Sequence, residues 1–303
     1  MKRHEPLRIG FIGIDTSHVV AFTELLNDAE HPYHVPGGNV CSAYGVKSAD
    51  FQKSYGRMDG YIEALTQRFG VKLAASIEEV AEQSDVIMLE SVDGRVHLEQ
   101  FKRLSPFRKP VFVDKPFALT SADALFMKAL AEEQGIPVMS CSALRFAEGL
   151  SQALANTPDG EIIGAECYGP MELEPTQPGM FWYGVHTADM LYRVLGKGCI
   201  RVRATTNADH DVITCEWADG RIGVIRGNRR GNSTFGGIIH RVGGSSFIDI
   251  ASSDKPYYAS LLEQVMIMFT TGKPPIDLNE TVEIIRFMEA VGESRQTGAL
   301  VTL

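Results

Sequence analysis

Apolar residues in the first half of the chain form short uninterrupted runs, separated by longer stretches with helical spacing. Runs typical of buried strands occur at 7–14, 40–44, 71–75, 86–90, 111–113 and 136–141. Helical spacing between them predicts helices at 19–26, 62–69, 77–83, 98–104 and 121–134. Continuous Val, Ile and Leu runs indicate strands covered on both faces, and parallel strands need helical crossovers. The first half therefore predicts an α/β domain with a doubly wound parallel sheet.

The periodicity changes after about residue 145, where apolar positions recur mostly at every second residue. Strands are predicted at 161–169, 200–204, 212–217, 221–226, 237–242 and 246–250. Asp219-Gly220 is a hairpin-turn signal between two of these runs. Helices are predicted at 184–195, 257–271 and 280–297. We therefore expect one domain over 1–145 and a second, α+β domain over 146–303 with an open, mainly antiparallel sheet.

The first predicted strand leads through a turn into a helix, where free backbone N–H groups and the helix dipole attract anions. The residues there are Gly10, Gly13, Asp15, Thr16, Ser17 and His18. A G-x-G-x-x-G fingerprint starting at Gly13 would need glycine at position 15 and glycine or alanine at position 18. Asp15 also places an anion where a pyrophosphate would lie, so the turn alone is a weak signal for a dinucleotide.

Polar residues follow the other strands of the predicted parallel sheet, at the edge where such sheets bind ligands. The second strand ends without the acid that often holds an adenosine ribose. Lys47 and Ser48 follow it, and they could hold a 2′-phosphate or be ordinary loop residues. Lys115 follows the strand at 111–113 and is a candidate for chemistry, or else a surface lysine.

Composition excludes several classes of partner. The chain has 303 residues and a net charge of −9, without the basic excess that nucleic-acid or acidic-membrane binding needs. Glycines interrupt the first apolar run, so we expect no membrane span. The five cysteines are scattered without a C-x-x-C pair. This predicts reduced thiols in a cytoplasmic protein rather than disulfides or a zinc site.

Three features together resemble the Gfo/Idh/MocA family of NAD(P)-dependent oxidoreductases. They are the glycine-bearing first turn, Asp114-Lys115-Pro116 after the fifth strand, and the Gly-x-His-x-x-Asp pattern from Gly184 to Asp189. The family pairs a Rossmann domain with a C-terminal domain on an open, largely antiparallel sheet, and acts mostly on sugars, inositols and related polyols. The resemblance implies a Rossmann-like dinucleotide-binding domain over 1–145. It also implies substrate binding and oligomerisation by 146–303, and NAD or NADP as cofactor.

The resemblance also implies roles for individual residues. Lys115 would lie by the nicotinamide and hydrogen-bond the substrate hydroxyl, and His186 would be the acid/base that takes the hydroxyl proton. The family's aspartate four residues before this histidine is Trp182 here, so the proton relay differs. Asp189 is a candidate substitute. The candidate cofactor-binding residues are Gly10, Gly13, Asp15, Thr16, Ser17, His18, Lys47, Ser48, Ser91, His97, Lys115 and Pro116. The candidate substrate-binding residues are Lys115, Arg145, Trp182, Tyr183, His186 and Asp189.

The expected function is hydride transfer between a nicotinamide and a secondary alcohol of a sugar, inositol or related polyol. Two alternatives stay open: a redox-neutral glycosidase or lyase that uses bound NAD transiently, and a non-catalytic ligand sensor on the same fold. No dense ligand spacing predicts a metal, although some acids and histidines could be ligands if the fold gathered them. These are Asp15, His18, His186 and Asp189. An uncovered apolar face of the second sheet would predict a homodimer or homotetramer.

Overall fold

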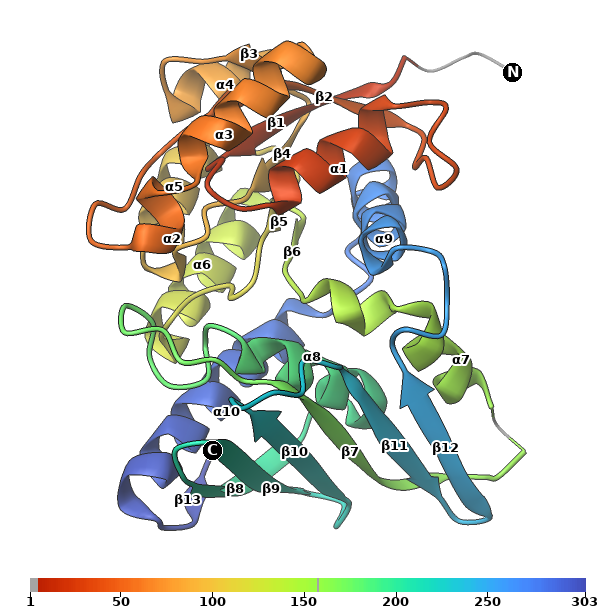
Figure 1. Cartoon of the computed structure of the whole chain (residues 1–303). Helices are drawn as coiled ribbons and strands as arrows, with labels where there is room; N and C mark the ends of the chain where they lie inside the picture. Colours follow the sequence, from red (N-terminus) through yellow and green to blue (C-terminus); the bar gives the residue numbers. More distant parts are fainter. Residues whose placement is uncertain (1–4, 157) are drawn as a thin grey trace. The chain divides into compact units, whose positions relative to one another are not determined.

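The protein, as a computed structural model that describes residues 5–156 and 158–303, divides into two compact units (Figure 1). The first unit contains the described residues up to Ala118 together with Ala122–Cys141 and Tyr258–Leu278. The second contains Leu119–Ser121, Ser142–Tyr257 and Asn279–Leu303. A single division at residue 145 was predicted, whereas each unit takes segments from distant parts of the chain. The return of residues 258–278 to the first unit is a tertiary contact that local periodicity does not encode.

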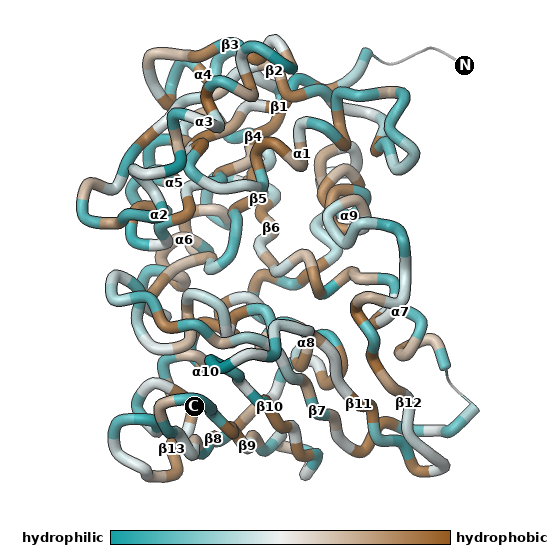
Figure 2. The backbone as a smooth tube through the Cα atoms, in the orientation of Figure 1, coloured by the Kyte–Doolittle hydropathy of each residue, from teal (hydrophilic) through white to brown (hydrophobic). Residues whose placement is uncertain are grey.

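The first unit is built on a six-stranded parallel sheet with the order β3-β2-β1-β4-β5-β6. The strands are β1 Leu7–Ile12, β2 Gly38–Tyr44, β3 Lys72–Leu73, β4 Val86–Leu89, β5 Val111–Val113 and β6 Val138–Met139. The order runs outward from β1 in both directions, as the doubly wound prediction required. Ile9, Phe11 and Ile12 have no exposed surface, in keeping with the hydropathy along β1 (Figure 2). The switch in strand direction between β1 and β4 is the place where such sheets bind ligands.

Helices connect these strands at nearly the predicted positions. They are α1 His18–Asn27, α2 Gln52–Tyr55, α3 Met58–Glu63, α4 Ile77–Gln83, α5 His97–Leu104 and α6 Ser121–Gln134. A π-helical turn, Ala64–Arg68, continues α3. Helix α4 has a side-chain N-cap, because Ser76 Oγ accepts a hydrogen bond of 3.1 Å from the N–H of Glu79. The Glu79 carboxylate accepts from the N–H of Ala75, one residue before the cap.

The second unit has a seven-stranded sheet with the order β12-β11-β7-β10-β9-β8-β13. The strands are β7 Ile162–Pro170, β8 Cys199–Thr206, β9 His210–Trp217, β10 Ile222–Asn228, β11 Gly236–Arg241, β12 Gly244–Asp249 and β13 Val301–Thr302. Only β7 and β10 pair in parallel, so the sheet is mainly antiparallel as predicted. Its helices are α7 Glu148–Ala155, α8 Gly184–Leu195 and α10 Leu278–Thr297. The sequence did not predict α7 or β13.

Helix α9, Tyr257–Thr271, belongs to the first unit for nearly all of its length. The ring of Tyr258 meets that of Phe22 edge-on, with 5.4 Å between centroids. The side chain of Met266 lies against Gly37 and Gly38, at the start of β2. A segment from late in the sequence thus completes the core beside α1.

Two further expectations from the sequence concerned the cysteines and membrane-spanning helices. The five cysteines are free, and four of them are buried. Burial raises the pKa of Cys167 and of Cys199 to about 12. None of the helices in the described part of the chain is long and apolar enough to cross a membrane.

Candidate active site and its ionisable cluster

The carboxyl ends of β1, β4 and β5 bring polar residues to one edge of the first sheet. The strand ladder continues one residue beyond β4 and β5. Glu90 N–H donates to Ile12 O over 2.6 Å, and Asp114 N–H donates to Leu89 O over 2.8 Å. Glu90 and Asp114 therefore follow adjacent strands in register. Lys115 comes next, with its own N–H bonded to Asp114 Oδ1 at 2.8 Å.

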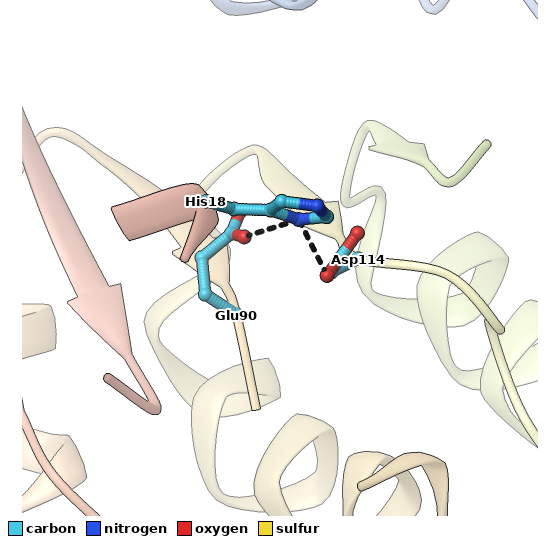
Figure 3. Close-up of side chains that lie close together, drawn as sticks. All are labelled: His18, Glu90 and Asp114. Carbon is cyan, nitrogen blue, oxygen red and sulfur yellow. Dashed lines mark ion pairs between the residues drawn. The ribbon is translucent and has the colours of Figure 1, made fainter. Parts of the chain in front are cut away.

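His18, the first residue of α1, joins this edge and contacts both acids (Figure 3). Its Nδ1 lies 2.9 Å from Asp114 Oδ2 and 3.8 Å from Glu90 Oε2. Both carboxylate oxygens of Glu90 are buried, and neither has a hydrogen-bond partner among the described residues. We call His18, Glu90 and Asp114 the strand-end triad.

The charges of the strand-end triad interact strongly because the acids are buried. Burial raises the pKa of Glu90 well above its ordinary value, and the nearby carboxylates of Asp114 and Asp15 raise it further. Burial also raises the pKa of Asp114, but His18 and Lys115 lower it by more, so Asp114 stays an acid of low pKa. Burial lowers the pKa of the Lys115 amine, against the opposing effect of Asp114.

The turn after β1 approaches the loop after β4 very closely. Gly13 has a φ of +82°, and a Cβ there would lie 2.3 Å from the N and Oγ atoms of Ser91. Only glycine meets both conditions. Asp15 is buried, and its two oxygens accept hydrogen bonds from Ser54 Oγ at 2.5 Å and from Val92 N at 2.9 Å. Burial raises the pKa of Asp15, and the hydrogen bonds from Ser54 and Val92 oppose that rise.

The segment after β2 folds onto this turn. Ser54 Oγ, besides its bond to Asp15, accepts from the N–H of Ser48 at 2.9 Å. The guanidinium of Arg57 donates to the backbone oxygen of Asp15 over 3.0 Å. Lys47 forms an ion pair with Asp59 at 2.7 Å, on the surface. Lys47 and Ser48 thus lie at the end of β2 as predicted, with partners from their own segment.

His97 and Gly10 also lie in the first unit, where each has close contacts with other segments of the chain. The fully buried ring of His97 places Nδ1 3.0 Å from Pro116 O and Nε2 2.8 Å from Ser91 O. It holds the loop after β4 against the loop after β5. Gly10 lies inside β1 rather than in the turn, and a Cβ there would meet Ser84 and Val80 near α4.

The second unit holds the predicted acid/base, His186, in the first turn of α8. Its Nδ1 lies 2.6 Å from Ser142 Oγ. The ring is flanked by Tyr183, whose centroid lies 5.5 Å away, and by Phe235 at 5.6 Å, both edge-on. Trp182, four residues before His186, is 6% exposed and contacts Tyr183.

Arg145 and Asp189, predicted to bind substrate, form a buried ion pair of 2.7 Å in the same unit. Arg145 also pairs with Glu280 of α10, and Asp189 accepts a hydrogen bond from Ser142 N. Burial raises the pKa of Asp189 and of Glu280, and Arg145 opposes both shifts. This network fixes Ser142, the partner of His186.

The predicted residues thus fall into two groups, one in each unit. The first edge gathers Gly13, Asp15, Thr16, Ser17, His18, Ser91, His97, Lys115 and Pro116. The second unit gathers Arg145, Trp182, Tyr183, His186 and Asp189. Sequence reasoning missed Glu90, Tyr258 and Phe235 as members of these clusters. The sequence does mark Glu90 as an acid directly after a buried strand. No local sequence feature, however, predicts its contact with His18.

Comparison with known proteins finds a family model that matches the first unit. Residues 8–141 match the model of an oxidoreductase family described as having an NAD-binding Rossmann fold. An uncharacterized oxidoreductase of Escherichia coli K12, YhhX, is 30% identical over 139 residues. The match covers 42% of this chain and 40% of that protein's length.

Two solved structures share the fold across nearly the whole chain. Myo-inositol 2-dehydrogenase from Lactobacillus plantarum has a TM-score of 0.80 at 15% identity and covers 99% of this chain and 100% of its own. Scyllo-inositol dehydrogenase from Lactobacillus casei, solved with NAD(H) and scyllo-inositol, has a TM-score of 0.80 at 12% identity. That match covers 98% of this chain and 99% of the other. At such identities the likeness shows the fold, and it confirms the predicted fold class.

Proposed function

We propose that this chain is an NAD(P)-dependent dehydrogenase of a sugar, inositol or related polyol, because residues 8–141 match the model of the Gfo/Idh/MocA oxidoreductase family. The observation that carries the proposal is the position of Lys115. It follows β5 at the carboxyl edge of a doubly wound sheet, beside the strand switch where this architecture binds its ligand.

The turn after β1 has features that suit the binding of a dinucleotide. The backbone at Gly13 has the positive φ and the close approach to Ser91 that a phosphate-binding turn uses. Helix α1 begins at His18, and Ser17 at its N-cap makes no side-chain cap. The N–H of His18 donates to Thr16 Oγ1 over 3.4 Å, and the N–H groups that follow it are suited to an anion. Lys47 and Ser48 are the candidates for a 2′-phosphate.

We assign the catalytic roles of Lys115 and His186 from the chemistry of their side chains. Bound NAD(P)⁺ supplies the acceptor for the hydride that leaves the carbinol carbon. Lys115 hydrogen-bonds the substrate oxygen through its ammonium, and His186 takes the hydroxyl proton. Ser142 and the ion pair behind it hold the His186 ring. The resemblance places Trp182 where the family has an aspartate, and tryptophan cannot accept a proton. In this chain His186 therefore transfers the proton without the help of an aspartate at that position.

The polyol class is supported by the surroundings of His186. Tyr183 and Phe235 stack with an interplanar angle of 10° and flank the imidazole. Aromatic faces beside a hydrogen-bonding group suit a ring that has apolar C–H faces and polar hydroxyls. Two of the structures that share this fold are inositol dehydrogenases.

Calorimetric titration of the cofactor-stripped protein with NAD⁺, NADH, NADP⁺ and NADPH tests the proposal. We expect micromolar binding of at least one oxidised and reduced pair, followed by NAD(P)H release with a panel of polyols. Gly13→Ala should weaken binding, because its Cβ would meet Ser91. Gly292→Ala is the matched control, since a Cβ there meets nothing within 4 Å. No binding of any of the four nucleotides would overturn the proposal.

We further propose that the uncovered face of the second sheet mediates a homodimer or homotetramer. Phe247 is 77% exposed and Ile222 57% exposed on strands of this sheet. Large exposed apolar side chains on a sheet favour association. Light scattering should give a mass at least twice the 33.3 kDa of one chain, and a monomeric mass would contradict this prediction.

A further inference from the structure

We propose that the strand-end triad of His18, Glu90 and Asp114 binds a divalent first-row metal ion such as Mn²⁺ or Zn²⁺. The proposal does not rest on the dehydrogenase activity, because metal binding is measured without nucleotide or substrate.

The donor atoms are already gathered. One ligand atom from each residue lies within 4.8 Å of the other two. Ligands bonded to Zn²⁺ at about 2.1 Å and at tetrahedral angles lie about 3.4 Å apart. The two measured separations from His18 Nδ1, 2.9 Å to Asp114 and 3.8 Å to Glu90, lie on either side of that value. Small side-chain adjustments would therefore complete the coordination.

The donor types select the class of ion. One imidazole nitrogen and two carboxylates suit Mn²⁺, Fe²⁺ and Zn²⁺, whereas Ca²⁺ and Mg²⁺ prefer oxygen alone. Three protein ligands leave a coordination position for water or a substrate oxygen, which is the pattern of catalytic rather than structural sites. The side chain of His18 is 13% exposed, so the edge is not sealed.

Glu90 is the residue that most requires a ligand. It has no exposed surface, and neither carboxylate oxygen is bonded to a described residue. Buried polar groups are normally satisfied, and an unpaired buried carboxylate is costly. Asp15 lies near enough to add to the negative potential, yet both of its own oxygens are bonded elsewhere. A divalent cation would satisfy Glu90 and neutralise it together with Asp114.

The surroundings of His18 hold its ring in place. Phe22 stacks on the imidazole with 5.2 Å between centroids, and Tyr258 meets it edge-on at 5.1 Å. Nδ1 lies close to Asp114 but is not aligned with it as a hydrogen bond. A packed imidazole held near two carboxylates is what a preorganised ligand set requires. The competing explanation is a protonated, neutral Glu90 beside a His18–Asp114 ion pair.

Titration of the chelator-stripped full chain with MnCl₂ and with ZnCl₂ separates these explanations. We expect one ion per chain with micromolar or tighter affinity, and a loss of the free Mn²⁺ electron paramagnetic signal. Glu90→Gln and His18→Asn should weaken binding at least about tenfold, a loss that even indirect changes around metal sites produce. Glu78→Gln is the matched control, because Glu78 makes an exposed ion pair with Arg103 in the same unit.

Thermal melting adds a second measurement. Bound metal should raise the melting temperature of the wild type and leave that of Glu90→Gln unchanged. In chelator, Glu90→Gln should melt at or above the wild-type temperature, since it replaces a buried carboxyl group whose oxygens have no hydrogen-bond partner among the described residues. Such a melt would also show that the variant folds. Two results would overturn the site: no binding of either ion by the wild type, or equal binding by the wild type and Glu90→Gln.

Discussion

Replacing Lys115 with methionine is expected to lower the turnover number about 10²- to 10³-fold, the loss that follows removal of one preorganised hydrogen-bond donor to a reacting oxygen. Methionine keeps much of the length and apolar body of lysine but removes the ammonium that would hydrogen-bond the substrate oxygen. The measurement is NAD(P)H release with the polyol found in the panel. His186→Asn should have a loss in the same range, because the amide cannot accept the hydroxyl proton.

The matched control is Lys102→Met. Lys102 lies on the outer face of α5 and pairs with Glu99 at 2.6 Å, largely in solvent. Removing that exposed pair should leave turnover unchanged. Full turnover in Lys115→Met would show that the lysine at the end of β5 has no catalytic part, whatever the substrate.

The largest loss of stability is expected from Arg145→Met, about 3–5 kcal/mol in the free energy of unfolding. Arg145 is the cation of a buried network, with side-chain exposures of 6% for Arg145 and 3% for Asp189. Without it, the buried Asp189 and the partly buried Glu280 lose the guanidinium with which both form ion pairs. Urea denaturation followed by circular dichroism measures the change, with Arg201→Met as the control. Arg201 pairs with Glu216 on an exposed surface, so its loss should cost at most about 1 kcal/mol.

The pH dependence of this loss identifies its cause. Burial raises the pKa of Asp189 and of Glu280 in the folded state, and Arg145 opposes that rise. In the variant both folded-state pKa values rise further, so folding takes up protons and stability falls as the pH increases through them. The deficit relative to the wild type should therefore shrink as the pH is lowered. A deficit independent of pH would point to lost packing instead.

Much of the fold follows from local sequence rules. The bounds of α6 and α9 were predicted to the residue, because amphipathic spacing and the glycines after them mark both ends. Helix α7 was missed, and β13 is only two residues long. The parallel pairing of β7 with β10 inside a mainly antiparallel sheet also went unpredicted, since strand direction depends on the connection and not on the strand.

Local sequence signals indicate the candidate catalytic residues, but they do not predict the contacts between charged residues around them. A lysine after a buried strand and a histidine opening a helix are local signals. No local signal predicts the contact between His18 and Glu90. Strands β2 and β3 lie between these residues in the sequence, and the contact forms because β1 and β4 are neighbours in the sheet. The hydrogen bonds of Asp15 to Ser54 and Val92 are equally non-local. They show how the turn after β1 accommodates a buried acid.

Because α9 belongs to the first unit, the core of that unit is completed late in protein synthesis. Domains generally fold as units while the chain is synthesised, at about 5–20 residues per second. The last strand of the first sheet, β6, leaves the ribosome on the order of ten seconds before Tyr258 and Met266 do. During that interval Phe22 and the start of β2 lack their cover. The nascent first unit therefore leaves these apolar residues uncovered until residues 257–271 have been made.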